Sequence, residues 1–191
     1  MPYGFKPVRS LYTRGPAVNL YRDYSIASGY ATGIGKGANV AITTDGTLII
    51  GAVGTNMAGV FAGVQYRDTD RQRAIAYEHQ WVASRTATEI VASVYDDPYL
   101  IFMAESDQDT TALVAGDVGE NADFIQTSAV NTTTGMDRQS IDSSTNATGA
   151  DIGWHIVGSA EEGETFTAAG TVMDVYVMPN EHMLKGTVAG I

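Results

Sequence analysis

Alternating acids at Glu105, Asp107 and Asp109 form one group of possible metal ligands in this chain of 191 residues. The spacing is typical of the first ligands of a calcium-binding loop, in which carboxylate oxygens coordinate the ion. Such a loop also needs a glycine at its sixth position and a glutamate at its twelfth, where this sequence has Thr110 and Gly116. We therefore interpret the stretch as a solvated acidic loop.

The glycine-rich stretch from Gly33 to Gly37 is a possible phosphate-binding loop, since closely spaced backbone amides can surround an anion. It lacks the Gly-Lys-Ser/Thr ending of such loops, and no helical pattern follows it. A flexible turn between two strands is the better interpretation.

Side chains suited to acid–base or nucleophilic catalysis are scarce. The histidines form no His-Glu-x-x-His pair, and the chain has no Gly-x-Ser-x-Gly motif. His155 lies in a predicted strand, where we expect a hydrogen-bonded structural role, and His79 should share a strand face with Trp81. The remaining candidates are His182 and the acids Glu161, Glu162 and Glu164, which share one glycine-containing turn and should be exposed.

The chain has no cysteine, which excludes thiolate metal sites and disulfides. Taken with the missing catalytic patterns, this predicts a protein that is not an enzyme, with no catalytic residue, no metal and no cofactor.

Charge narrows the choice of partner. The net charge is −11 and the isoelectric point about 4.5, whereas binding to nucleic acid or an anionic membrane needs a basic face. Residues 96–191 carry sixteen acids against Arg138 and Lys185, while residues 1–95 have a net charge of +3.

No apolar run approaches the about 20 residues of a membrane span, and no signal-peptide pattern is visible. We expect a soluble protein made in the cytoplasm, with neither nucleic acid nor membrane as partner.

Short apolar runs separated by turn residues are the dominant pattern, and helical periodicity is scarce. Asp45-Gly46 is a hairpin signal, and Trp81 is a candidate core anchor. The run 67–73 should be a solvated loop. We predict an all-β fold, an antiparallel sandwich or barrel-like single domain spanning residues 25–191. The strands are expected at residues 27–34, 38–43, 47–50, 59–66, 74–83, 89–95, 99–104, 138–142, 152–159 and 172–178.

The first 24 residues differ from this body. Pro2 and Pro7 restrict the backbone, and no apolar residue recurs at helical spacing. We predict an extended arm over residues 1–24 that docks on a surface, because its large apolar side chains would otherwise face water. Its charged residues before Asp23 are all basic: Lys6, Arg9, Arg14 and Arg22.

Two destinations for this arm are open. It could fold back and neutralise its own acidic domain, or it could add to the sheet edge or surface of another subunit, as extended segments often do. The residues that we expect at such an interface are Pro2, Tyr3, Gly4, Phe5, Lys6, Pro7, Val8, Arg9, Leu11, Tyr12 and Arg14.

Residues 2–9, with the sequence PYGFKPVR, resemble the opening of the capsid decoration, or cement, proteins of tailed bacteriophages. The order of several short motifs carries this resemblance, which runs over most of the chain. Residues 66–74 and 179–191 have no counterpart. The further motifs, in the order of the family, are residues 24–31, 59–64, 117–123, 138–144 and 156–158.

The resemblance implies a non-enzymatic, β-rich structural protein of the virion that binds the outer surface of an icosahedral shell. It implies the major capsid protein as partner, and copies of this chain itself in a homotrimer. In such a protein the arm would lie across subunit junctions, where burial of apolar surface contributes about 25 cal/mol per Å². The acidic body would stay hydrated.

A carbohydrate- or receptor-binding β module of a phage virion is the alternative. The position of the exposed aromatic side chains separates the two functions. A concave patch around Trp81 or Trp154 would favour sugar binding, because aromatic rings stack on sugars, whereas an aromatic arm outside the domain would favour the capsid role.

Overall fold

The structure is a computed structural model that describes residues 2–12, 16, 20–69, 75–107, 111–126, 130–149, 152–160 and 172–185. Over these residues it contains fifteen strands and one 3-10 turn (Ala115–Asp117), which confirms the all-β prediction. The strands are β1 (Lys6–Ser10), β2 (Arg22–Ile26), β3 (Ile34–Gly35), β4 (Asn39–Ile42), β5 (Thr47–Ile50), β6 (Gly59–Asp68), β7 (Ile75–Glu78), β8 (Gln80–Trp81), β9 (Ala87–Tyr95), β10 (Leu100–Glu105), β11 (Asn121–Ala122), β12 (Phe124–Gln126), β13 (Gln139–Ile141), β14 (Trp154–Ser159) and β15 (Asp174–Pro179).

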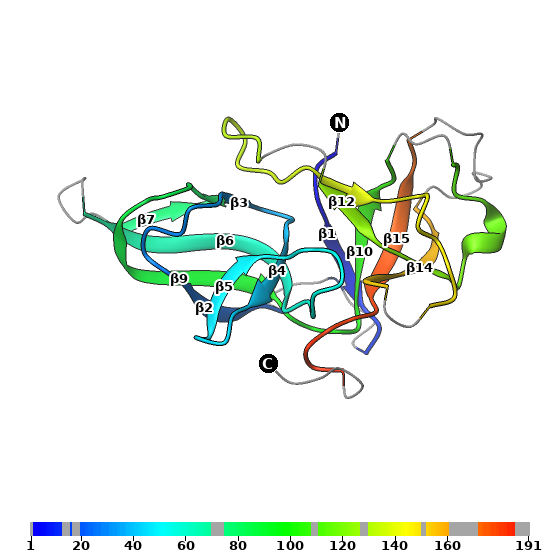
Figure 1. Ribbon diagram of the computed structural model, residues 1–191, viewed down its shortest axis with the longest axis horizontal. Coiled ribbons are helices and arrows are strands. Elements are labelled where there is room, and N and C mark those ends of the chain that lie inside the picture. Colours follow the sequence, from blue (N-terminus) through cyan, green and yellow to red (C-terminus); the bar gives the residue numbers. More distant parts are fainter. Residues whose placement is uncertain are drawn as a thin grey trace.

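Five strands close into a small barrel, on the left in Figure 1. Their order is β4-β5-β2-β9-β6, and the sheet closes because β4 pairs with β6 as well as with β5. Strands β2 and β5 run parallel, and the other neighbours run antiparallel. Strand β7 adds to the second half of β6 outside the barrel. Closure removes edges that an open sheet would expose.

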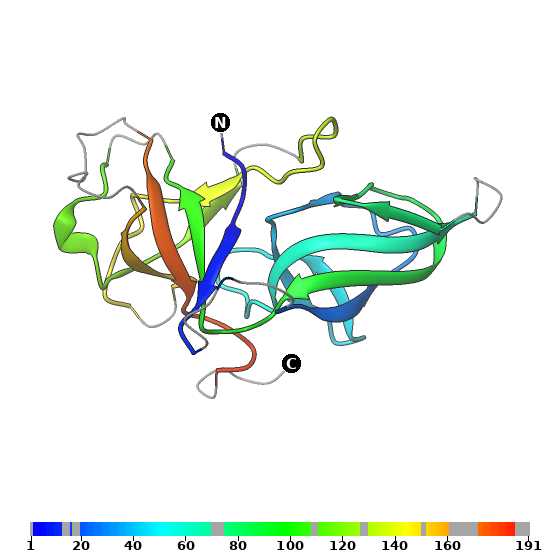
Figure 2. The ribbon, with the colours of Figure 1, turned by 180° about the vertical axis from the view of Figure 1, so that it is seen from behind.

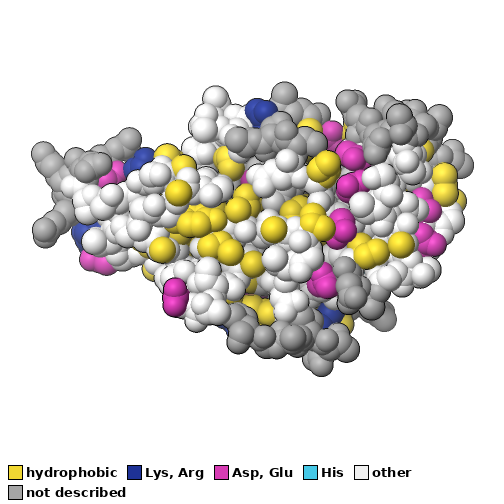
Figure 3. Space-filling model, viewed as in Figure 1, with side chains coloured by type: hydrophobic (Ala, Val, Ile, Leu, Met, Phe, Trp, Pro, Cys, Tyr) yellow, Lys and Arg dark blue, Asp and Glu magenta, His cyan; other side chains and the backbone are white. Residues whose placement is uncertain are grey.

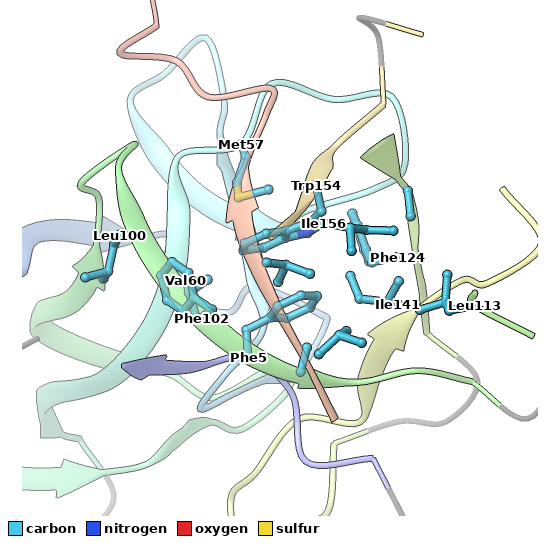
Figure 4. Close-up of a cluster of buried hydrophobic side chains, with 14 residues drawn as sticks. Phe5, Met57, Val60, Leu100, Phe102, Leu113, Phe124, Ile141, Trp154 and Ile156 are labelled. Atoms are coloured by element: carbon cyan, nitrogen blue, oxygen red, sulfur yellow. The ribbon is translucent and has the colours of Figure 1, made fainter. Parts of the chain in front are cut away.

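A five-stranded antiparallel sheet forms the second lobe, in the order β1-β10-β15-β14-β11. The β12–β13 hairpin packs against this sheet, since Phe124 and Ile141 belong to the same apolar cluster as Phe102 and Trp154. Figure 4 shows these side chains converging from several strands. We call the two parts of the molecule the barrel lobe and the sheet lobe.

The cores of the two lobes meet at strand β6. Successive side chains of a strand point to opposite faces. Accordingly, Val60 belongs to the core of the sheet lobe and Phe61 to the core of the barrel lobe. Each core contains one tryptophan without exposed surface, Trp81 in the barrel and Trp154 in the sheet lobe. The prediction that Trp81 is a core anchor is confirmed.

The Asp45-Gly46 turn joins β4 and β5 as predicted. Gly46 has φ 76°, a backbone conformation that only glycine adopts without strain. The return strand, Thr47–Ile50, agrees with its prediction residue for residue.

Residues 27–33 form turns, so the strand predicted at 27–34 is wrong over most of its length. The chain reverses there because Gly29 has φ 79° and the amide of Tyr30 donates to the carbonyl of Ala27 at 3.0 Å. The strand of this region, β2, lies earlier, inside the stretch that the sequence predicted to be an arm.

The strand predicted at 74–83 is divided at His79, where the chain bends. Strand β7 stays with β6, whereas β8 leaves that sheet and pairs with β3, Trp81 opposite Ile34. His79 is exposed and Trp81 is buried, so the prediction that they share a face is wrong.

The charged run at 67–73 is only partly a loop. Arg67 and Asp68 belong to β6, and Asp68 is 3% exposed because it faces Arg85 across an ion pair of 2.7 Å. Residues 70–74 lie outside the described residues.

Candidate interaction surface

The predicted arm contributes to the core of its own domain. Strand β1 pairs antiparallel with β10, Lys6 opposite Met103. Phe5 is 1% exposed and stacks on Trp154, with ring centroids 4.2 Å apart and planes at 7° (Figure 4). The division into an arm (1–24) and a body (25–191) is therefore corrected, because Phe5 completes a core that would otherwise expose Trp154. Met1 and Arg14 lie outside the described residues.

Two glycines fix the start of β1. Gly4 has φ 72° and Gly37 has φ 90°. The amide of Phe5 donates to the carbonyl of Gly37 at 2.9 Å, and a Cβ atom on Gly4 would lie 2.8 Å from that same oxygen. The close approach thus requires glycine. Gly37 belongs to the predicted β3–β4 turn, which here ties the barrel lobe to the sheet lobe.

Tyr3 and Lys6 contact each other at the start of β1. The Tyr3 hydroxyl donates to Oδ1 of Asp174, and burial together with that carboxylate raises the pKa of Tyr3. The Lys6 ammonium lies 3.6 Å from the centroid of the Tyr3 ring, which is cation–π geometry. Lys6 itself remains exposed.

Strand β1 is an edge strand of its sheet. Within the described residues, no strand pairs with its outer side, where a bridge from Arg9 to Pro16 is present. Lys6 and Arg9 are exposed, and Pro7 and Val8 are half-buried. A charged edge that contains proline is a common protection against unwanted pairing, yet an edge can also accept a partner's strand.

An exposed apolar patch lies where β1 ends, and we call it the Tyr99 patch. The Tyr12 and Tyr99 rings meet edge to face, with centroids 4.8 Å apart, and the amide of Leu11 donates to the carbonyl of Tyr99 at 3.1 Å. Tyr12 is 73% exposed, the largest value among the four residues of the patch. We define the patch as Leu11, Tyr12 and Tyr99, together with Leu184, whose chain neighbour Lys185 has its ammonium 5.6 Å from the Tyr99 ring centroid.

Asp97 holds the patch in shape. Its carboxylate accepts hydrogen bonds from the Ser10 hydroxyl at 3.2 Å and from the amide of Tyr99 at 2.9 Å. These contacts join the end of β1 to the turn before β10. The neighbouring Tyr99 side chain raises the pKa of Tyr12.

His182 positions the C-terminal part of the patch. Its side chain has no exposed surface, its Nδ1 accepts the amide of Leu184 at 3.2 Å, and its backbone pairs with Met57. Burial, assisted by the charge of Lys185, lowers the pKa of His182 to about 4. The Lys185 ammonium lies 5.6 Å from the Tyr99 ring centroid.

Sequence reasoning selected Leu11 and Tyr12 but missed Tyr99 and Leu184. Tyr99 was assigned to a strand, although Asp97-Pro98 before it indicates a turn that can expose a side chain. Leu184 lies in the segment without a counterpart in the resembled family, and no pattern in the sequence connects it to Tyr99.

The other candidate residues have structural roles or lie outside the described residues. Glu105 ends β10 and is 6% exposed, so the described beginning of the acidic stretch is not the solvated loop that the sequence predicts. Asp107 accepts the Ser143 hydroxyl at 2.6 Å. His155 Nδ1 lies 2.9 Å from Oδ1 of Asn121, which confirms its hydrogen-bonded role. The part of the chain that the structure describes has no group of three or more His, Cys, Asp or Glu that could hold a metal. Undescribed candidates are Asp109, Glu161, Glu162 and Glu164.

The tryptophans cannot form the concave sugar-binding patch considered above, since neither Trp81 nor Trp154 has exposed surface.

Across the described residues, no helix has the length and apolar character needed to cross a membrane. Comparisons of the chain with protein-family models, with curated proteins and with solved structures gave no match.

Proposed function

We propose that this protein is a structural virion protein, a decoration protein that binds the outer surface of a tailed-phage capsid and stabilises the shell at subunit junctions. The observation that carries the proposal is the Tyr99 patch beside the edge strand β1, at the end of a sheet lobe formed largely by the acidic half of the sequence. The ordered motifs that resemble this family, beginning with residues 2–9, support the same function.

The Tyr99 patch and the basic residues of β1 are suited to different parts of a contact with the capsid. The Tyr99 patch would be buried against the major capsid protein, and tyrosine is among the residues that dominate binding energy at interfaces. Lys6 and Arg9, exposed on β1, favour an acidic partner surface. Figure 3 shows acidic side chains on the lobe that contains β10, β14 and β15, and these would keep the outer surface of the bound protein hydrated.

Self-association into a homotrimer belongs to the same proposal. Strand β1 completes the sheet of its own chain, so its partner would add to the outer side of that edge or cover it. Repetition of a modest contact over the many equivalent junctions of a shell multiplies its effect on the stability of the particle.

Occupancy on heads that lack the native decoration protein tests the proposal. Tyr12→Ala and Tyr99→Ala should each lower occupancy at limiting protein, because truncation of a buried tyrosine at an interface costs on the order of 2 kcal/mol, or about thirtyfold in affinity. Lys6→Ala should have a smaller effect, since an exposed ion pair contributes about 0–1 kcal/mol.

Tyr77→Ala is the matched control. Tyr77 is 75% exposed, like Tyr12, but lies on β7 in the barrel lobe. Unchanged occupancy of the Tyr12 and Tyr99 variants would refute the role of the patch. Release of the native protein by moderate salt would show that charge, rather than apolar burial, holds it on the shell.

A further inference from the structure

The outer face of the barrel contains a groove of about 530 Å³ along strands β2, β9, β6 and β7. These four strands lie side by side on the near side of the barrel in Figure 2. The volume falls within the about 300–1,000 Å³ that is usual for small-molecule sites. The groove lies in the barrel lobe, apart from the Tyr99 patch.

Small residues make the floor of the groove. Ser93 of β9 has Asp23 of β2 on one side and Gly63 of β6 on the other. Gly63 follows a bulge in β6 and has no side chain. The surface is therefore recessed at this point relative to the larger side chains that line the rest of the groove. A glycine within a strand often marks close approach of a ligand.

Tyrosines form the walls. Tyr77, opposite Gln65 on β6, is 75% exposed. Tyr21 is 49% exposed and meets the Tyr95 ring edge to face, with centroids 6.3 Å apart. The contact with Tyr95 orients Tyr21, and both wall residues expose ring surface to the solvent. Exposed aromatic surface grouped in a concavity is a feature of binding sites.

Polar groups lie between the tyrosines. The Ser93 hydroxyl donates to Oδ1 of Asp23 at 3.0 Å, which orients the carboxylate while leaving it capacity to accept further hydrogen bonds. Gln65 and Glu78 also line the groove, and among the described residues that line it there is no lysine or arginine. The lining thus offers acceptors and donors of hydrogen bonds with a negative charge overall.

We infer that this groove binds a neutral saccharide. The tyrosine rings can stack on the apolar faces of sugar rings, and the carboxylates and the amide can pair with sugar hydroxyls, which both donate and accept. The acidic lining disfavours phosphorylated, sulfated or sialylated ligands, because like charges repel. A basic peptide would also match the negative charge, and tetralysine represents that competing ligand in the test. The inference does not rest on the proposed capsid role.

An array of immobilised neutral gluco-, manno-, galacto- and N-acetylhexosamine oligosaccharides, with sialylated and sulfated glycans and tetralysine on the same slide, tests the inference with the full-length chain. Binding to at least one neutral saccharide is expected, without binding to the anionic glycans. Titration of that saccharide should then shift the amide NMR signals of Gly63 and Ser93 in a saturable way.

Tyr77→Ala should weaken the affinity for the saccharide at least about tenfold, whereas Tyr77→Phe, which keeps the ring, should retain it. Tyr12→Ala is the control, with an equally exposed tyrosine removed from the other lobe. The inference is overturned if no neutral saccharide binds, if tetralysine alone shifts the Gly63 and Ser93 signals, or if Tyr12→Ala weakens binding as much as Tyr77→Ala. A failure of the capsid proposal would leave these outcomes unchanged.

Discussion

Phe5 shows how a residue's surroundings decide its role. In the sequence Phe5 is one of several large side chains in a basic segment, which predicts that it points outward and contacts a partner. In the structure its ring lies against Trp154 in the middle of the sheet lobe. A substitution at this position should therefore act first on folding.

Phe5→Ala should lower the free energy of unfolding by about 3–5 kcal/mol, the usual effect of removing a buried phenylalanine ring. Urea unfolding followed by tryptophan fluorescence measures the change. Lys6→Ala is the neighbouring control, because its exposed side chain, with its cation–π contact to Tyr3, should contribute about 1 kcal/mol or less. Equal stability of the two variants would mean that Phe5 is not part of the core.

His182 should make the protein less stable in mild acid. Burial lowers its pKa to about 4 from an ordinary value of 6.5, so the unfolded chain binds the proton more readily than the folded chain. This contribution to stability is complete above pH about 6.5 and is lost as the pH falls towards about 4, by up to about 3 kcal/mol.

The measurement is the unfolding free energy between pH 7 and pH 4 for the wild type and for His182→Asn, whose amide oxygen can accept the Leu184 amide in place of Nδ1. Asp137 acts in the opposite direction, since burial raises its pKa to about 6 and favours the folded state at low pH. The difference between the two proteins isolates His182. If the unfolding free energies of the wild type and the variant changed in parallel with pH, His182 would not be the source of the loss of stability in acid.

At the scale of elements, strand β1 decides whether the sheet lobe is complete. Its removal would expose one edge of β10 and the face of Trp154 on which Phe5 stacks. A chain that lacks residues 1–10 should be markedly less stable, and its Trp154 emission should shift to longer wavelength as the ring meets water. A peptide of residues 2–12 added in excess should reverse the shift. A truncated chain with wild-type stability and emission would contradict this role.

The sequence was informative where a local rule decides the structure. The Asp45-Gly46 hairpin depends on one glycine with positive φ and correctly located β5 as its return strand, and short apolar runs between turn residues located several others, including β9. Strand partners were out of reach, because the pairing of β1 with β10 or of β4 with β6 joins segments far apart in the chain.

The candidate site was predictable only in part, for the same reason. Leu11 and Tyr12 stand out as apolar residues in a basic segment. Tyr99 lies beside Leu11 and Tyr12 because Asp97 accepts hydrogen bonds from both Ser10, at the end of β1, and the amide of Tyr99. The position of Leu184 depends on the backbone bridge between His182 and Met57. None of these contacts follows from spacing in the sequence. The groove on the barrel was missed because its wall tyrosines, Tyr21 and Tyr77, lie far apart in the sequence.

For the whole molecule, two cores that share strand β6 should unfold together. Each core contains one of the two tryptophans of the chain, so Trp81→Phe leaves a reporter in the sheet lobe and Trp154→Phe leaves one in the barrel lobe. In each variant, the urea transition seen by fluorescence should coincide with the transition seen by far-UV circular dichroism. Separate midpoints in either variant would show that the lobes unfold independently.

The pairing of the first strand with β10 also sets an order of events during synthesis. Residues 2–12 leave the ribosome before their partner strand, which is made about a hundred residues later, and β15 follows later still. At about 5–20 residues per second, Phe5 waits about 7–30 seconds for Trp154. Pairings this distant in sequence also slow folding of the released chain to the millisecond-to-second range. During that interval the first strand of one nascent chain can meet β10 of another, so an exchanged strand between neighbouring copies is the misassembly to which this topology is most exposed.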